Sequence, residues 1–254
     1  MIETVDRVRA VVTGGSSGIG YDVARRFAQA GAEVVITGQD PQRLRASARH
    51  IGAKAIRLTL NDPTSVALFF DELGDRQANF FLANAGSPER SRDDQDAQTA
   101  GALNLLIRAA PLVATGGVLA VTNTLFTQYP AHQVPEEFKP YVDGKQQLAR
   151  CVGEVGAKHC GIRVLDIALG FVDGTKGLRR IKTADEAAAY TLYVASVTPG
   201  GRLTTASEAG AFIFDLLHRT TGGVRAGIDG SIVALAELTA TKPNHVITNS
   251  GISS

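Results

Sequence analysis

Short apolar runs alternate along the chain with longer segments whose apolar residues recur every three or four positions. The short runs predict strands near 8–13, 33–37, 54–59, 79–83, 117–123, 162–168 and 224–228. The longer segments predict helices near 18–30, 41–50, 63–74, 95–113, 138–160, 184–196 and 206–219. Strands that alternate with helices pair in parallel through right-handed crossovers. The pattern therefore predicts an α/β fold, a Rossmann-type doubly wound parallel sheet of about seven strands with helices on both faces.

Composition narrows the class of protein. The chain has 254 residues and a net charge of +1, and it shows no linker, repeat or block of like charge. One domain over residues 1–254 is therefore expected, with neither nucleic acid nor a membrane as a partner. The chain lacks a run of about 18 apolar residues, and residues 1–6 lack the basic-then-apolar order of a signal peptide. A soluble cytoplasmic protein is expected.

The two cysteines, Cys151 and Cys160, fall in one predicted helix. Their separation along the axis is about 13.5 Å, which is beyond the reach of a disulfide. We therefore expect both to be small buried residues. The sequence has no clustered Cys and His ligand spacing, so no metal site is expected.

A glycine-rich turn, Thr13-Gly14-Gly15-Ser16-Ser17-Gly18-Ile19-Gly20, joins the first predicted strand to the first predicted helix. Glycines let the backbone turn sharply and approach phosphate oxygens, and a helix N-terminus offers unpaired N–H groups and a partial positive charge. The turn therefore predicts a site for the pyrophosphate of a dinucleotide. A turn that only closes a strand on a helix is the alternative.

Polar residues also follow two later strands, at the edge where a doubly wound sheet binds ligands. Asn84-Ala85-Gly86 follows the strand near 79–83 and would leave room for an adenosine and its ribose. An ordinary turn is the alternative there. Thr122-Asn123-Thr124 ends the strand near 117–123.

Two predicted helices carry further candidates. Tyr141 and Lys145 lie one turn apart on one helix face, a spacing that also arises by chance. Asn104 lies inside the helix near 95–113, where a single Asn more often faces solvent or neighbouring backbone.

Taken together, these segments resemble the short-chain dehydrogenase/reductase family over roughly residues 7–230. TGGSSGIG resembles the family's TGxxxGxG turn, ANAG its NAG motif, and Tyr141 with Lys145 its YxxxK pair. Asn104 in ALNLL is similar to the family's helix asparagine, and GIRV at 161–164 to the start of its sixth strand. The ordered motifs imply the fold predicted above.

The chain also departs from the family pattern. Thr124 stands in place of the family's serine, and the 17 positions from it to Tyr141 are a longer interval than usual. Leu165 replaces an asparagine, Leu169 a proline, and Thr59 an adenine-binding aspartate. Because these changes gather on the substrate side, the family's substrates transfer poorly to this chain.

The resemblance implies hydride transfer between a nicotinamide cofactor and the carbonyl or alcohol carbon of a small molecule. Tyr141 would be the general acid/base, Lys145 would lower the pKa of its phenol and hold the nicotinamide ribose, and Thr124 would hydrogen-bond the substrate oxygen. Asn104 would hold a water on a proton route. The implied cofactor-binding residues are Gly14, Ser16, Ser17, Gly18, Ile19, Gly20, Gly38, Gln39, Asn84, Ala85, Gly86, Tyr141, Lys145, Gly170 and Val172.

Further expectations follow from the same resemblance. A substrate lid would lie near 175–201 and a C-terminal tail at 231–254. Because Gly38 stands where NAD-specific members have an acidic residue, NADP(H) is favoured over NAD(H), with Thr37, Gln39 and Arg43 as donors to the 2′-phosphate and Asp40 opposing it. Epimerisation or dehydration through a transient ketone, and a cofactor-binding sensor without turnover, are the alternatives.

A homodimer or homotetramer is also expected. In the family the helix near 138–160 and the helix before it pack across a two-fold axis. This chain offers small and apolar residues for that contact at Leu148, Ala149, Val152, Val155 and Gly156.

Overall fold

The computed structural model describes residues 8–219 except positions 90, 129, 135, 171, 174 and 176–202, together with residues 225–228. Its main sheet contains β1 (Arg9–Val12), β2 (Glu33–Gly38), β3 (Lys54–Arg57), β4 (Ala78–Ala83), β5 (Val113–Thr124), β6 (Arg163–Leu169) and β9 (Arg225–Ile228). These seven strands are parallel, in the order β3-β2-β1-β4-β5-β6-β9. The strand order reverses between β1 and β4, which confirms the predicted doubly wound α/β sheet. A second, two-stranded sheet pairs β7 (Val172–Asp173) with β8 (Thr204–Thr205).

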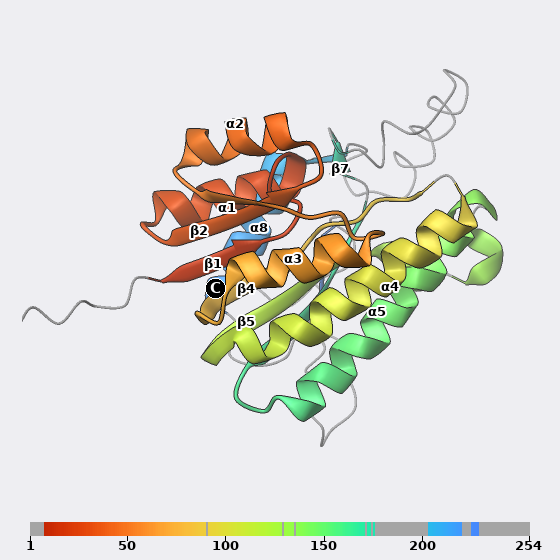
Figure 1. The fold of residues 1–254 in the computed structure, drawn as a ribbon. Coiled ribbons are helices and arrows are strands. Elements are labelled where there is room, and N and C mark those ends of the chain that lie inside the picture. The colour runs from red at the N-terminus through yellow and green to blue at the C-terminus, as the bar shows by residue number, and fades with distance from the viewer. Residues whose placement is uncertain are drawn as a thin grey trace, which may run out of the picture.

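Helices cover both faces of the main sheet (Figure 1). The described α-helices are α1 (Gly18–Gln29), α2 (Pro41–Ile51), α3 (Pro63–Leu73), α4 (Arg92–Ala109), α5 (Lys139–Lys158) and α8 (Ala206–Arg219). The 3-10 turns are η1 (Ala110–Leu112), η2 (Leu125–Gln128), η3 (Ala131–Gln133) and η4 (Glu136–Phe138). One apolar core lies under α3, α4 and α5, and another lies under α1, α2 and α8. Since both faces are covered, the central strands are mostly apolar, with Arg9 and Asp166 as buried charged exceptions.

Two predicted elements had wrong boundaries. The helix near 95–113 begins earlier because the Ser91 hydroxyl caps α4 by accepting the N–H three residues further on, at 3.1 Å. It ends earlier because the chain tightens into η1, which contains Pro111. The strand near 117–123 begins at Val113, with a shift of register before it pairs regularly with β4.

Two glycines let α4 pack closely against its neighbours around the site. A Cβ on Gly101 of α4 would lie 1.7 Å from the Leu60 carbonyl oxygen, so only glycine lets α4 approach the loop after β3. A Cβ on Gly144 of α5 would lie 2.3 Å from the Thr99 hydroxyl. Glycine there brings α5 close to α4 along its N-terminal half, which is where the site residues of α5 lie.

The residues expected to form an assembly surface on α5 mostly face the protein's own core. Leu148, Val152 and Val155 are buried against the sheet, so that expectation was wrong for them. Ala149 and Gly156 are half-buried. The apolar spacing on α5 therefore marks the core-facing side of an amphipathic helix.

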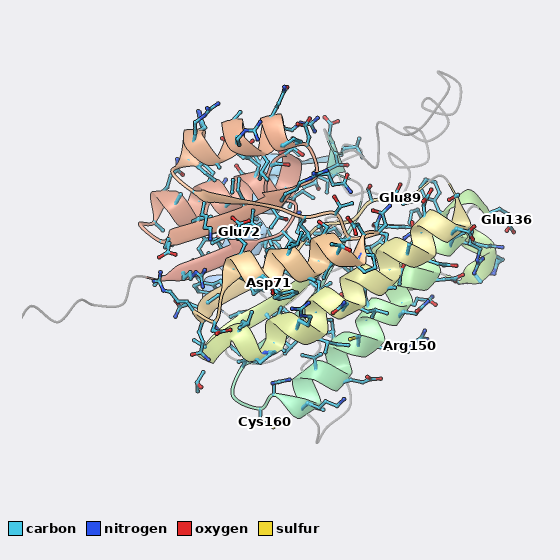
Figure 2. The ribbon with its side chains drawn as sticks, in the orientation of Figure 1. Asp71, Glu72, Glu89, Glu136, Arg150 and Cys160 are labelled. Atoms are coloured by element: carbon cyan, nitrogen blue, oxygen red, sulfur yellow. The ribbon has the colours of Figure 1, made fainter. Side chains whose placement is uncertain are left out.

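The cysteines differ from each other. Cys151 is buried in α5, as expected, whereas Cys160 lies beyond the end of α5 and is exposed. Figure 2 shows Cys160 at the C-terminal end of α5, and Arg150 pointing away from the sheet. The expectation that Cys160 is buried was wrong because α5 ends at Lys158, before the chain turns into β6.

Several predictions lie outside the described residues. These are the helix near 184–196, the lid near 175–201 apart from Thr175, and the tail at 231–254. That residues 1–254 form one domain stays a prediction. Among the helices that the structure describes, none is long and apolar enough to cross a bilayer.

Candidate active site

A cavity of about 380 Å³ opens where the loops after β1 and β4 meet, at the carboxyl edge of the sheet. Ligand sites of this volume are common at the switch point of doubly wound sheets. Most of the predicted site residues line it: Gly14, Ser16, Ser17, Gly18, Ile19, Gly38, Gln39, Asn84, Ala85, Gly86, Thr124, Tyr141, Lys145, Gly170 and Val172. Gly20 and Asn104 do not line it.

The glycine turn after β1 leaves room for a phosphate. Gly14 and Gly18 have φ angles of 68° and 58°, in the left-handed region that favours glycine. A Cβ on Gly18 would meet no atom within 4 Å, so the backbone faces open space there. A Cβ on Gly20 would lie 2.6 Å from the Asn84 side-chain nitrogen. The glycine at position 20 therefore allows α1 to pack closely against the loop after β4.

The start of α1 is free of side-chain caps. Ser17, at its N-cap position, makes no capping hydrogen bond, whereas Asp40, Asp62 and Ser91 cap α2, α3 and α4. The first N–H groups of α1 are thus left for a ligand, and the helix dipole favours an anion there. The open turn and this uncapped helix start fit the pyrophosphate of a dinucleotide.

Thr13 fastens the loops around the cavity to one another. Its Oγ1 accepts the backbone N–H groups of Asn84 and Ala85, both at 3.0 Å. The Asn84 amide donates to the Thr13 carbonyl oxygen at 3.3 Å and accepts the Thr122 hydroxyl at 3.3 Å. The ends of β1, β4 and β5 are therefore held together on one wall of the cavity.

α5 contributes Tyr141 and Lys145 to the same cavity. The Lys145 Nζ atom lies 5.5 Å from the centroid of the Tyr141 ring and donates to the Thr122 carbonyl oxygen at 2.9 Å. The Asn123 side-chain nitrogen donates to the Lys145 carbonyl oxygen at 3.1 Å. These bonds fix α5 to the end of β5 at both the backbone and the side chain of Lys145.

Burial shifts the pKa values of both members of this pair. It raises the pKa of the Tyr141 phenol well above the ordinary value of 10.0. It lowers the pKa of Lys145 to about 8, against the opposing effect of the Asp166 charge. The expectation that Lys145 and a positive nicotinamide together lower the pKa of Tyr141 concerns the cofactor complex and stays a prediction. At pH 7 Tyr141 is a neutral phenol and Lys145 an ammonium.

Thr124 lies at the end of β5 and is buried. Its backbone N–H donates to the Asn123 side-chain oxygen at 2.9 Å, and its Oγ1 accepts the Phe126 N–H at 3.4 Å. The long interval to Tyr141 contains three short 3-10 turns, which return the chain to the cavity. Thr124 and Tyr141 consequently line one cavity despite their separation in the sequence.

Asn104 is exposed on α4 and stands apart from the cavity, so its predicted place in the site was wrong. Gln98, about 9 Å earlier along the helix axis, is buried and lines the cavity instead. Its Oε1 accepts the Ser87 N–H at 2.9 Å, and its Nε2 donates to Glu89. Figure 2 shows Glu89 beside the N-terminal end of α4.

The cavity lining also includes groups suited to an adenosine. Leu58 and Leu60 line the cavity on either side of Thr59, which stands where the family has an aspartate. Arg43 of α2 also lines it. The Asp40 carboxylate accepts the Arg43 N–H at 3.1 Å and lies 3.3 Å from the Arg43 guanidinium.

Thr37 and Arg43, which were expected as donors to a 2′-phosphate, also line the cavity. The lining residues that were not expected to bind cofactor or to act in catalysis are Leu58, Leu60, Ser87, Pro88, Gln98, Thr122, Asn123, Phe126, Phe138, Leu169 and Thr175. Many of these residues are next in the sequence to predicted site residues at strand ends. Their position in the sequence could therefore have indicated that they line the cavity. Gln98 and Phe138 have no such signal. Within the described residues, no cluster of three or more His, Cys, Asp and Glu side chains could hold a metal ion.

Comparison with known proteins gives consistent matches. Residues 14–232 match the family profile described as enoyl-(acyl carrier protein) reductase. An uncharacterized short-chain type dehydrogenase/reductase from Sinorhizobium fredii is 26% identical over 93% of this chain, which spans 45% of that relative's length. Sulfoacetaldehyde reductase 2 from Chromohalobacter salexigens is 28% identical over 72% of this chain and 79% of its own.

Solved structures share the fold. A short chain dehydrogenase from Burkholderia cenocepacia in complex with NADP is 25% identical, with a TM-score of 0.72 over 88% of this chain and 96% of its own. L-sorbose reductase from Gluconobacter frateurii, complexed with NADPH and L-sorbose, is 21% identical, with a TM-score of 0.74 over 91% and 98%. The cavity, its motifs and these matches agree: the chain belongs to the short-chain dehydrogenase/reductase family of oxidoreductases.

Proposed function

We propose that this protein transfers hydride between NADP(H) and the carbonyl or alcohol carbon of a small molecule, with Tyr141 as the general acid/base. One observation carries the proposal. Tyr141, Lys145 and Thr124 line the same cavity as the open glycine turn, so a cofactor held at the turn and a substrate beside Tyr141 share one space. When bound, the nicotinamide supplies or accepts the hydride.

Tyr141 supplies the proton for reduction. The phenol is protonated at pH 7, a form that burial favours further by raising its pKa, and it can donate to the developing alkoxide oxygen. In the oxidative direction the same oxygen would receive a proton, and the positive charge of Lys145 favours the phenolate.

Lys145 and Thr124 support that proton transfer. One N–H of the Lys145 ammonium donates to the Thr122 carbonyl oxygen. Two N–H groups therefore remain for the hydroxyls of a ribose. The Thr124 Oγ1 accepts the Phe126 N–H, so its own proton is available to the substrate oxygen. Phe126 and Phe138 line the cavity and would contact the apolar part of a substrate.

A preference for NADP(H) fits the adenosine end of the cavity. Gly38 ends β2 without a carboxylate, so nothing at that position repels a 2′-phosphate. Asp40 caps the N-terminus of α2, where its carboxylate accepts the N–H groups of Gln42 and Arg43. Arg43 remains a positive side chain on the cavity wall. The structural relative from Burkholderia cenocepacia holds NADP.

The test is a panel of aldehydes and ketones, including sulfoacetaldehyde, followed at the nicotinamide absorbance with both cofactors. Tyr141→Phe should leave the NADPH dissociation constant within about threefold and lower turnover by roughly 10²–10⁴-fold, because it removes the proton donor alone. Tyr21→Phe, which loses a hydroxyl on α1 outside the cavity lining, should match the parent.

Retention of parental turnover by Tyr141→Phe would overturn the assignment. Equal moles of product and oxidised cofactor separate net reduction from epimerisation or dehydration through a transient ketone, and any turnover excludes a sensor. Cytoplasmic location and the absence of nucleic-acid or membrane partners stay predictions.

A further inference from the structure

Four charged side chains are buried in the part of the chain that the structure describes: Arg9, Asp22, Lys145 and Asp166. A buried ion costs several kcal/mol unless an opposite charge or strong hydrogen bonds accompany it. Arg9 lies beside Glu33, and Asp22 receives two arginines of its own helix. Lys145 belongs to the proposed active site, whereas Asp166 has no part in it so far.

Asp166 points toward the helix that carries Lys145. It lies in the middle of β6, where side chains alternate between the two faces of the sheet. Leu165 and Ile167 pack in the core under α1 and α8, and Val164 packs in the core under α5. Asp166 therefore faces α5, and it is 2% exposed.

Lys145 is held over the same part of the sheet. Asp166 pairs in register with Val121, and two positions further along the same face Ala168 pairs with Asn123. The Asn123 side chain is the one that bonds the Lys145 carbonyl oxygen. The lysine and the aspartate thus lie over adjacent strands, on the same face of the sheet.

We propose that Asp166 is a positioning residue, whose buried carboxylate keeps Lys145 in its ammonium form and at its place in the cavity. Asp166 does not line the cavity, so it would act on the reaction only through Lys145. The inference rests on the proposed function, in which the Lys145 ammonium serves cofactor and proton transfer. Burial alone lowers the pKa of Lys145, and the negative charge of Asp166 raises it toward its ordinary value.

The titratable groups of α5 that face inward near this pair are neutral at pH 7. Tyr141 faces Lys145 from α5, and Cys151 is buried further along the same helix. Burial raises the pKa of the Tyr141 phenol and of the Cys151 thiol. The neighbours of Asp166 and Ala168 in β5, Val121 and Asn123, do not titrate. The inward residues of α4 that are buried near α5 are Gln95, Gln98 and Thr99. In β9, Arg225 occupies the register position next to Asp166.

The direct test titrates Lys145 by NMR in protein labelled with ¹³C at the lysine Cε, without cofactor or substrate. Lys145→Arg assigns the signal by removing it. The parent should titrate near pH 8, and Asp166→Asn should lower that midpoint by roughly one pH unit, since a nearby opposite charge favours the ammonium. Asp22→Asn, which removes a buried carboxylate on α1, should leave it unchanged.

A midpoint in Asp166→Asn within about 0.3 pH unit of the parent would overturn the inference and leave Asp166 a structural residue. If Asp166→Asn fails to fold, the ¹³Cγ signal of Asp166 in the parent decides. A carboxylate at pH 7 supports the proposal, and a neutral carboxyl group overturns it.

The NADPH dissociation constant across the same pH range separates this inference from the proposed function. Affinity should fall as pH rises through the Lys145 midpoint, because the ammonium loses its charge and a donor. The fall should begin about one pH unit lower in Asp166→Asn. A shifted Lys145 midpoint with NADPH affinity independent of pH would contradict the proposed role of Lys145. An unshifted midpoint with pH-dependent affinity would contradict only the role of Asp166.

Discussion

Arg43 is the side chain on which the proposed preference for NADP(H) depends. It is a positive group on the cavity wall, and the end of β2 beside it carries Gly38 instead of a carboxylate. A charge-assisted hydrogen bond from a guanidinium to a phosphate stabilises binding by about 1.5–3 kcal/mol. About half of the Arg43 side chain is exposed to solvent, which screens its charge and favours the lower end of that range.

We therefore expect Arg43→Gln to raise the NADPH dissociation constant about tenfold and to change that of NADH by less than about twofold. Arg45→Gln is the matched control, because Arg45 is an exposed arginine of the same helix that does not line the cavity. Calorimetry with both cofactors measures the effect. Equal losses for NADPH and NADH would place the 2′-phosphate elsewhere.

At the scale of elements, α4 is the helix that the sequence described least well. Pattern reading finds a helix by its apolar face, but the N-terminal half of α4 buries Gln95, Gln98 and Thr99. In the sequence, the inward face of α4 therefore resembles an exposed face. Asn104 was predicted as the site residue of this helix, whereas Gln98 is the one that lines the cavity. The turn after β1 and the Tyr141–Lys145 pair were predictable because glycine conformation and helix spacing fix them locally.

Gln98 ties the loop after β4 to α4, and removing its amide should loosen that loop. Gln98→Ala leaves the Ser87 N–H without its acceptor, at a cost of about 1–2 kcal/mol. The NADPH dissociation constant should rise roughly tenfold, since Gly86 and Ser87 line the cavity. Asn104→Ala, an exposed change on the same helix, should match the parent. If the two variants bind NADPH equally, the loop does not depend on Gln98.

At the scale of the whole molecule, the fold followed from the alternation of apolar runs and helical segments, whereas the pKa values of the site residues did not. Tyr141 and Lys145 are adjacent on any helix, but their pKa values depend on burial between α5 and the sheet. The sequence likewise did not show which helix faces are exposed to solvent. Spacing along α5 gave an apolar face, and only the packing showed that this face covers the sheet.

A contact between two copies of the chain would therefore involve residues that the fold leaves exposed. Ile107 of α4 and Leu68 of α3 are 57% and 61% exposed, large fractions for side chains of this type. α4 lies beside α5 on the outside of the molecule (Figure 1), where the family resemblance predicts a two-fold contact. A symmetric dimer would bury Ile107 against its copy's surface and leave Leu68 of α3 nearer the rim.

We expect light scattering at micromolar concentration to give at least twice the chain mass of 26.7 kDa. Ile107→Glu should shift the mass toward a single chain, because a carboxylate buried without a partner costs several kcal/mol at an interface. Leu68→Glu, an equal change on the neighbouring helix α3, should leave the mass of the parent intact. A parent mass of one chain would contradict the assembly itself. Dissociation by Leu68→Glu instead of Ile107→Glu would move the contact from α4 to α3.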